Sequence, residues 1–186
     1  MKNSTATEQK PQTFIVHTHV DASVYSAFST FNNFILNRRG LTLKLFPLLM
    51  TGMGIAHVAS SYTVMGIAFI ALGALLPLAY VGFHRRSLAN QIKQYKLERP
   101  RLAYKVSLQQ SGLFVENEKE STLYPYEMCY GAYRVPQYCY VYITKSKCFI
   151  LPVKDLQDGV SEEMLWEFLQ EKLGQWKTKS FIKKTK

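Results

Sequence analysis

The sequence has no Asp, Glu, Lys or Arg between Leu45 and Phe83, a run of 39 residues in a chain of 186. About 20 apolar helical residues cross a hydrocarbon core of about 30 Å, so this run has the length of two spans. A soluble protein of this size has little use for such a segment, since its core helices need only one apolar stripe. The missing charge therefore predicts an integral membrane protein.

Cysteine is scarce and unpaired. The residues are Cys129, Cys139 and Cys148, and all three follow the uncharged run. An odd number without paired spacing argues against a disulfide framework, and no second Cys or His stands at metal-ligand spacing. We therefore expect free thiols on the reducing side of the membrane and no metal site.

Motifs that assemble catalytic groups are also missing. The chain has no Gly-rich phosphate loop, no His-Glu-x-x-His, no Gly-x-Ser-x-Gly and no pair of Cys-x-x-Cys. His17 and His19 share one face of an expected strand but have no third ligand nearby. His57, inside the uncharged run, is expected to be a neutral residue near the membrane interface. We expect no catalytic residues, no cofactor and no enzyme activity.

The N-terminal part precedes the uncharged run. Residues 1–12 are polar, lack the apolar core of a secretory signal and are expected to be disordered. Residues 13–40 predict a cytoplasmic segment with a short strand, Thr13 to Val20, and an amphipathic helix capped by Asp21. The apolar residues of this helix recur every three or four positions: Val24, Phe28, Phe31 and Ile35.

Residues 41–84 predict a transmembrane hairpin, with spans at about 43–59 and 63–83. Ser60-Ser61-Tyr62 is a short uncharged connection, so the two helices must run antiparallel. Lys and Arg close to a span favour the cytoplasm, and arginines flank both ends of the hairpin. We therefore expect a multi-pass protein of the cell membrane with both termini cytoplasmic. The flanking arginines are also candidates for contact with anionic lipids: Arg38, Arg39, Arg85 and Arg86.

Small residues recur every four positions in the first span. Gly52, Ala56 and Ser60 form one ridge, and such ridges let helix backbones approach closely in lipid. We expect this ridge to pack against the second span. A second copy of the chain, or another membrane protein, is the alternative partner.

After the hairpin the sequence becomes β-rich. Residues 85–100 predict a helical connector that Pro100 ends. Residues 101–174 predict an antiparallel meander closed by a helix, because short β-branched and aromatic runs alternate with turns. The expected strands are 102–109, 113–116, 121–126, 129–135, 138–144 and 148–151. Ser161 and Gly174 predict the ends of the helix, and its expected buried residues are Leu165, Phe168, Leu169 and Leu173.

Two features of this region are candidates for binding. Tyr138, Tyr140 and Tyr142 alternate along one strand, which predicts either a half-buried sheet face or a platform for a ligand. Residues 175–186 form a basic tail, expected to be either a solubilising tail or an anchor for anionic lipids. Its lysines are Lys177, Lys179, Lys183, Lys184 and Lys186. Because the net charge of +10 is concentrated in such flanks and not on the β-rich region, nucleic acid is not an expected partner.

Two loose motifs lie in the β-rich region, Leu123-Tyr124-Pro125-Tyr126-Glu127-Met128 and Phe149-Ile150-Leu151-Pro152-Val153-Lys154-Asp155-Leu156. Together with the strand, helix and hairpin before them, they resemble the YcxB-like family of small bacterial membrane proteins. The similarity extends over about residues 13–174, although this chain has Tyr126 near a position where many members have tryptophan. The resemblance implies a membrane α+β protein with a pleckstrin-homology-like cytoplasmic domain, and no established activity.

The sequence leaves two classes of function open. The first is a non-enzymatic binding module that the hairpin anchors at the inner leaflet, with a lipid headgroup or a protein as its ligand. The second is a structural or assembly subunit that pairs with copies or partners through its transmembrane helices.

Overall fold

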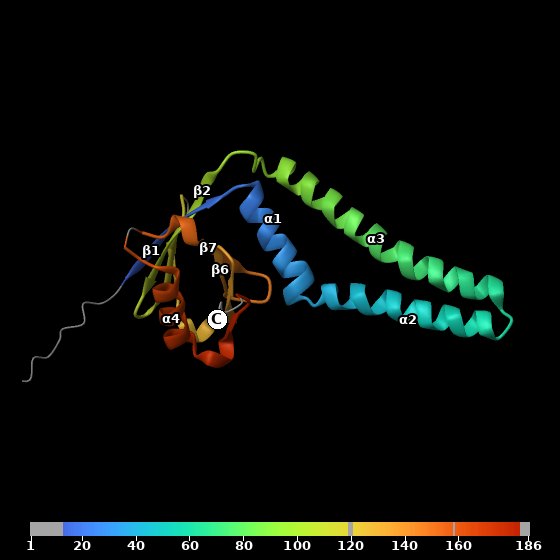
Figure 1. Cartoon of the computed structure of the whole chain (residues 1–186). Helices are drawn as coiled ribbons and strands as arrows, with labels where there is room; N and C mark the ends of the chain where they lie inside the picture. Colours follow the sequence, from blue (N-terminus) through green and yellow to red (C-terminus); the bar gives the residue numbers. More distant parts are fainter. Residues whose placement is uncertain (1–12, 119–120, 158, 183–186) are drawn as a thin grey trace, which may run out of the picture. The chain divides into compact units, whose positions relative to one another are not determined.

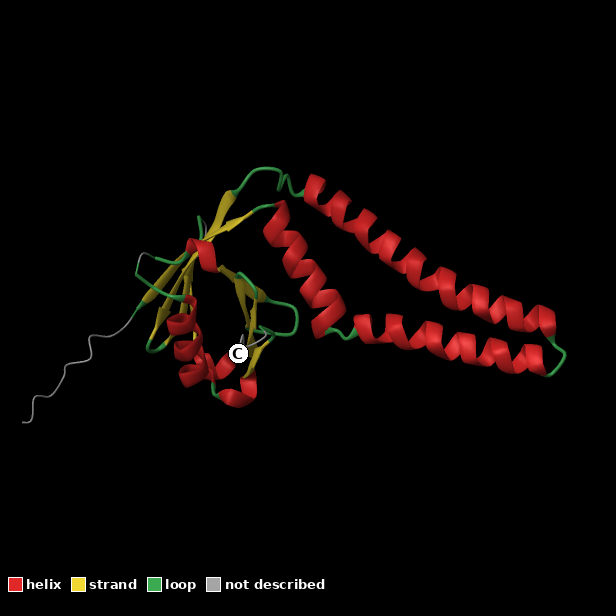
Figure 2. Ribbon diagram, in the orientation of Figure 1, coloured by secondary structure: helices red, strands yellow, loops and turns green. Residues whose placement is uncertain are grey.

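A computed structural model describes residues 13–118, 121–157 and 159–182 (Figure 1). The protein combines helices with largely antiparallel sheets, so its class is α+β (Figure 2). The described residues divide into two compact units. One is β-rich and contains the residues up to Val20 and those from Arg101 onward; the other is helical and comprises Asp21–Pro100.

The first sheet of the β-rich unit has the strand order β1-β2-β3-β4 and is antiparallel throughout. Its strands are β1 (Phe14–Val20), β2 (Arg101–Gln109), β3 (Gly112–Glu116) and β4 (Ser121–Tyr124). β1 lies at one edge and pairs with β2 from Phe14↔Leu108 to Val20↔Arg101. The helical unit is therefore inserted between two paired strands. Residues 13–40, expected as one segment, divide between the two units: the strand belongs to the β-rich unit and the helix to the helical unit.

The second sheet has the order β7-β6-β5-β8. Its strands are β5 (Gly131–Val135), β6 (Tyr138–Tyr142), β7 (Cys148–Pro152) and β8 (Thr178–Ser180). The first three form the expected meander, but β8 pairs with β5 in parallel. The expected basic tail thus begins with a single helical turn, η4 (Gln175–Lys177), and a strand of this sheet.

The core of the β-rich unit joins both sheets to α4 (Glu162–Leu173). Ser161 caps the helix by accepting a hydrogen bond from the Met164 amide, and Gly174, with φ 78°, ends it. Both ends and the expected buried face of this helix are confirmed. Its buried residues pack with side chains from the two sheets: Phe14, Val16, Val106, Leu108, Leu113, Cys139, Val141 and Leu151.

The helical unit begins with α1 (Ala22–Thr30), whose cap is the expected Asp21. A π-helical turn, η1 (Phe31–Leu36), follows and precedes α2 (Arg39–Ala59). The expected second span and connector form one continuous helix, α3 (Thr63–Gln94), which packs against α2 as a hairpin (Figure 2). Tyr25 of α1 donates a hydrogen bond of 2.6 Å to Gln91 of α3 and so links the first helix of the unit to the last.

Candidate membrane-contact surfaces

The helices α2 and α3 are each long and apolar enough to cross a membrane. Only 6% of the apolar window in α2 and 11% of that in α3 is buried within the protein. The core helix of a soluble protein would be mostly buried, since it must remove its apolar side chains from water. The apolar side chains of this hairpin instead face outward along nearly its whole length.

Three glycines form the contact between α2 and α3. A Cβ on Gly54 would lie 2.7 Å from the Gly66 carbonyl oxygen, and one on Gly66 would lie 2.6 Å from that of Gly54. Gly73 similarly faces Met50, because a Cβ added to Gly73 would lie 2.8 Å from the Met50 Cβ. These contacts bring the two backbones close, as small residues do between helices in lipid.

The expected ridge is on a different face of α2. A Cβ added to Gly52 would meet nothing within 4 Å, and Ala56 and Ser60 are exposed. Because a helix turns by about 100° per residue, positions 52 and 54 point in widely different directions. The expectation that Gly52, Ala56 and Ser60 pack against the second span is therefore not met, and the ridge stays open.

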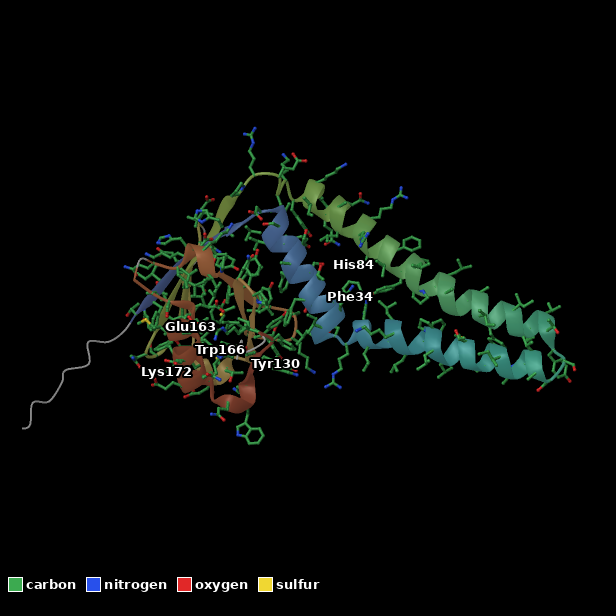
Figure 3. All side chains as sticks on the ribbon, viewed as in Figure 1. Phe34, His84, Tyr130, Glu163, Trp166 and Lys172 are labelled. Carbon is green, nitrogen blue, oxygen red and sulfur yellow. The ribbon has the colours of Figure 1, made fainter. Side chains whose placement is uncertain are left out.

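A polar cluster joins η1 to the end of the hairpin. Arg39 donates to the Tyr80 hydroxyl at 2.8 Å, and that hydroxyl donates to Asn33 Oδ1 at 3.2 Å. Asn33 Nδ2 lies 3.0 Å from His84 Nδ1, and the Phe34 ring stands edge-on to His84 with centroids 4.9 Å apart (Figure 3). Arg39, although exposed, therefore has a partner within the protein, and Arg38, Arg85 and Arg86 are exposed as well.

The tyrosines of β6 do not form an open platform. Tyr140 and Tyr142 are 0% and 1% exposed, and Tyr138 is half-buried and stacked on Tyr140 with centroids 6.0 Å apart. Strand β6 lies in the interior of its sheet, between β7 and β5, and packing within the protein covers its phenol face at Tyr140 and Tyr142. Of the two interpretations of these tyrosines, a sheet face or a ligand platform, the structure supports a buried sheet face.

A different aromatic and basic surface is exposed on the β-rich unit. It surrounds a hollow of about 410 Å³ beside the paired strands β5 and β8. We call it the Trp176 surface and define it by five residues: Tyr130, Tyr133, Trp176, Lys177 and Lys179. Trp176 is 102% exposed, as in an extended peptide, and Tyr130 is 49% exposed. The side chains of both lysines are also in solvent.

An ion-pair cluster fixes α4 to the sheet that carries this surface. Arg134 of β5 contacts Glu162 at 2.6 Å and Glu163 at 2.7 Å, in the first turn of α4. Figure 3 shows Glu163 and Trp166 on this helix. The hydrogen bond from Arg134 holds the pKa of Glu163 below its ordinary value. Carboxylates in a first helical turn also interact favourably with the helix dipole, so this cluster stabilises the helix start.

The remaining candidate residues are the three cysteines and His57, and their contacts indicate structural roles. The three cysteines are free, and burial raises the pKa of Cys129 to about 11 and that of Cys139 to about 12. His57 Nδ1 lies 2.9 Å from the Met53 carbonyl oxygen, one turn earlier on α2. Within the described part of the chain, no three His, Cys, Asp or Glu residues are grouped to hold a metal ion.

Sequence reasoning missed Trp176 and the Asn33–Tyr80–His84 contacts. Trp176 lies two residues after the helix-ending Gly174 and directly before Lys177, the first lysine of the basic tail, and this position is a signal in the sequence. The polar cluster had no such signal, because its residues are far apart in sequence. Of the predicted lipid-contact lysines, Lys177 and Lys179 belong to the exposed surface, while Lys183, Lys184 and Lys186 lie outside the described residues.

These features define an α+β protein in which a β-rich domain is interrupted by an outward-facing apolar helical hairpin. Comparison with known protein families, with curated proteins and with solved structures finds no match.

Proposed function

We propose that the protein is a non-enzymatic, membrane-anchored binding module. In this proposal α2 and α3 span the cell membrane, and the β-rich unit lies at the inner leaflet and binds a ligand there. The outward-facing apolar surface of the hairpin carries the proposal, since such a surface is stable in lipid and costly in water. Tethering would hold the domain at a high effective concentration for any ligand at the membrane.

The order of elements supports a pleckstrin-like fold and a relationship to the YcxB-like family. The strands β1 to β7 form two successive antiparallel sets, and an amphipathic C-terminal helix packs into the core between them. In this proposal the helical unit, which contains the hairpin, occupies the connection between the first two strands, and the paired Val20 and Arg101 flank it.

Cysteine labelling tests the topology in intact cells. Ser61→Cys places a thiol in the tight loop, and Ser146→Cys places one in an exposed turn of the β-rich unit. We expect a membrane-impermeant maleimide to label Ser61→Cys from outside and Ser146→Cys only after permeabilisation. The parent chain is the control, because its own cysteines are buried or half-buried. Labelling of Ser146→Cys in intact cells would contradict the proposed orientation.

An assembly role is the second candidate, and the open ridge on α2 supports it. Gly52, Ala56 and Ser60 leave space for a helix of another chain, as small-residue ridges do in membrane dimers. If the chain assembles there, Gly52→Leu with Ala56→Leu abolishes cross-linked oligomers. The matched control, Ala71→Leu with Ala74→Leu on exposed positions of α3, leaves them intact. Unchanged oligomers in the first variant would remove this candidate.

A further inference from the structure

We infer that the Trp176 surface is where the β-rich unit contacts the membrane, with the Trp176 ring inserted among the headgroups of anionic lipids. This inference rests on the proposed membrane anchoring and names the ligand of the anchored domain. Four observations carry it: the exposure of the aromatic side chains, the rigidity of their backbone, the charge around them, and the contrast with the other tryptophan.

The exposure of Trp176 has no explanation within the domain. An aromatic side chain of this size removes much apolar area from water when it is buried, yet Trp176 is 102% exposed. Tyr130, on the same hollow, is 49% exposed. Trp and Tyr concentrate at membrane–water interfaces, because an apolar ring with one polar group suits the headgroup region.

The backbone that carries Trp176 is firmly held. Thr178 donates its hydroxyl to the Gly174 carbonyl at 3.2 Å, and Thr178 also pairs with Ala132 of β5. Gly131 packs so closely that a Cβ there would lie 2.8 Å from the Lys177 carbonyl oxygen. The segment directly after the tryptophan is thus fixed to the second sheet, and the hydrogen bond from Thr178 to Gly174 closes the turn that contains the tryptophan. A ring presented on an ordered backbone loses little conformational entropy when it binds.

The charge around the ring suits an anionic surface. Lys177 and Lys179 line the hollow, and none of the described residues that line it carries a carboxylate. Lys177 Nζ contacts Glu127 only through the main-chain carbonyl, at 3.0 Å, and Lys179 lies over the Phe181 ring at 5.0 Å. Neither of these two contacts involves a carboxylate. Each lysine near an anionic bilayer strengthens binding about fivefold.

The chain contains a natural internal reference. Its other tryptophan, Trp166, is only 5% exposed and belongs to the core of the β-rich unit (Figure 3). Lipid contact should therefore change the fluorescence of Trp176 and leave that of Trp166 constant. The part of the signal that Trp176→Phe removes identifies the contribution of Trp176 without disturbing the core.

The test uses the full chain in nanodiscs of phosphatidylcholine, with and without phosphatidylserine. We expect Trp176 emission to shift to the blue and acrylamide quenching to fall several-fold only in the anionic discs. Lys177→Gln with Lys179→Gln should restore quenching to the level in neutral discs. Lys145→Gln with Lys154→Gln removes the same charge from other exposed positions and should change nothing.

Three outcomes would overturn the inference: Trp176 freely quenched in both kinds of disc, Trp176 protected in both, or protection that depends on a co-purifying protein. The proposed anchoring has its own readout in the same experiment. If the chain fails to co-elute with discs, the anchoring is wrong; if it co-elutes with Trp176 freely quenched, only the inference about this surface is wrong. A parallel variant, Trp176→Ala, must leave the thermal transition unchanged, since the side chain makes no core contact.

Discussion

At the scale of single residues, burial separates structural groups from groups available for contact. Tyr140 is packed within its sheet, whereas Trp176 and Tyr130 are in solvent. Both sets are aromatic and both lie next to β-strands, so composition alone does not distinguish them. Their surroundings do: Tyr140 lies on the central strand β6 and is fully covered by packing, whereas Trp176 lies just before the edge strand β8 and is not covered.

Truncating a buried tyrosine should cost far more stability than truncating an exposed one. We expect Tyr140→Ala to lower the free energy of unfolding by about 3–5 kcal/mol, because it leaves a cavity in a packed interior. Tyr130→Ala, at a half-exposed position, should lower it by less than about 1 kcal/mol. Denaturant unfolding followed by circular dichroism measures both. Equal losses would contradict the buried position of the β6 tyrosines.

The cysteines should react slowly with alkylating reagents. Only the thiolate reacts, and burial raises the pKa of Cys129 to about 11 and that of Cys139 to about 12. At pH 8 the thiolate fraction of Cys129 is then about one in a thousand. Because both pKa values are raised, reactivity should increase as the pH rises toward them. Mass spectrometry after iodoacetamide treatment should find these thiols modified quickly only in denaturant; rapid modification of the native protein would refute this.

At the scale of elements, the packing of α2 against α3 depends on which face of α2 carries each glycine. Gly54, Gly66 and Gly73 face the partner helix, while Gly52 faces outward. The spacing of small residues in the sequence identified a ridge, but it did not show which ridge the second helix would occupy. Tertiary packing decides this, because the face of α2 that meets α3 depends on the rotation of each helix about its own axis.

Enlarging an inward glycine should disrupt the helix pair, whereas enlarging an outward one should not. In Gly54→Leu, the new Cβ would lie 2.5 Å from Ile70 Cγ1 and 2.7 Å from the Gly66 oxygen. We expect a stability loss of about 1–3 kcal/mol from overpacking in detergent micelles. Gly52→Leu, the matched control on the same helix, should leave the thermal transition of the helical unit unchanged. A larger loss in the control would reverse the assignment of the two faces.

At the scale of the whole molecule, the β-rich domain is discontinuous in sequence. β1 precedes the hairpin, and its Phe14 and Val16 belong to the core formed with residues after Arg101. The domain therefore cannot be complete without β1, which precedes the two apolar helices in the sequence. Both ends of the helical unit, Asp21 and Pro100, are also directly continuous with paired strands, at Val20 and Arg101.

Removal of the helical unit should leave a folded soluble domain. Since Val20 and Arg101 are cross-strand partners, an Asn-Gly dipeptide in place of Asp21–Pro100 would close β1 and β2 as a two-residue hairpin. We expect this variant to be a soluble monomer with a single cooperative thermal transition. The fragment 101–186 alone lacks β1 and should aggregate or stay unfolded. If that fragment folds equally well, β1 is not an essential part of the domain.

Much of the architecture was predictable because it depends on local pattern. Asp21, Ser161 and Gly174 mark helix ends through capping, which involves only neighbouring residues. The antiparallel pairing within β2–β4 and within β5–β7 follows from short runs and turns, whereas the expected single meander is wrong, because the strands divide between β4 and β5 into two sheets. The parallel pairing of β8 with β5 was not predictable, since its register joins residues more than 40 positions apart and has no local signature.

The candidate sites depended more on tertiary structure. The sequence by itself determined that the chain has two apolar helices of membrane-spanning length, since charge-free length is a property of the chain. Only the tertiary structure decided which side chains are accessible: it buried the β6 tyrosines, turned Gly52 outward and left Trp176 on the surface. The physical reason is that accessibility depends on what packs against a residue, and those neighbours come from distant parts of the sequence.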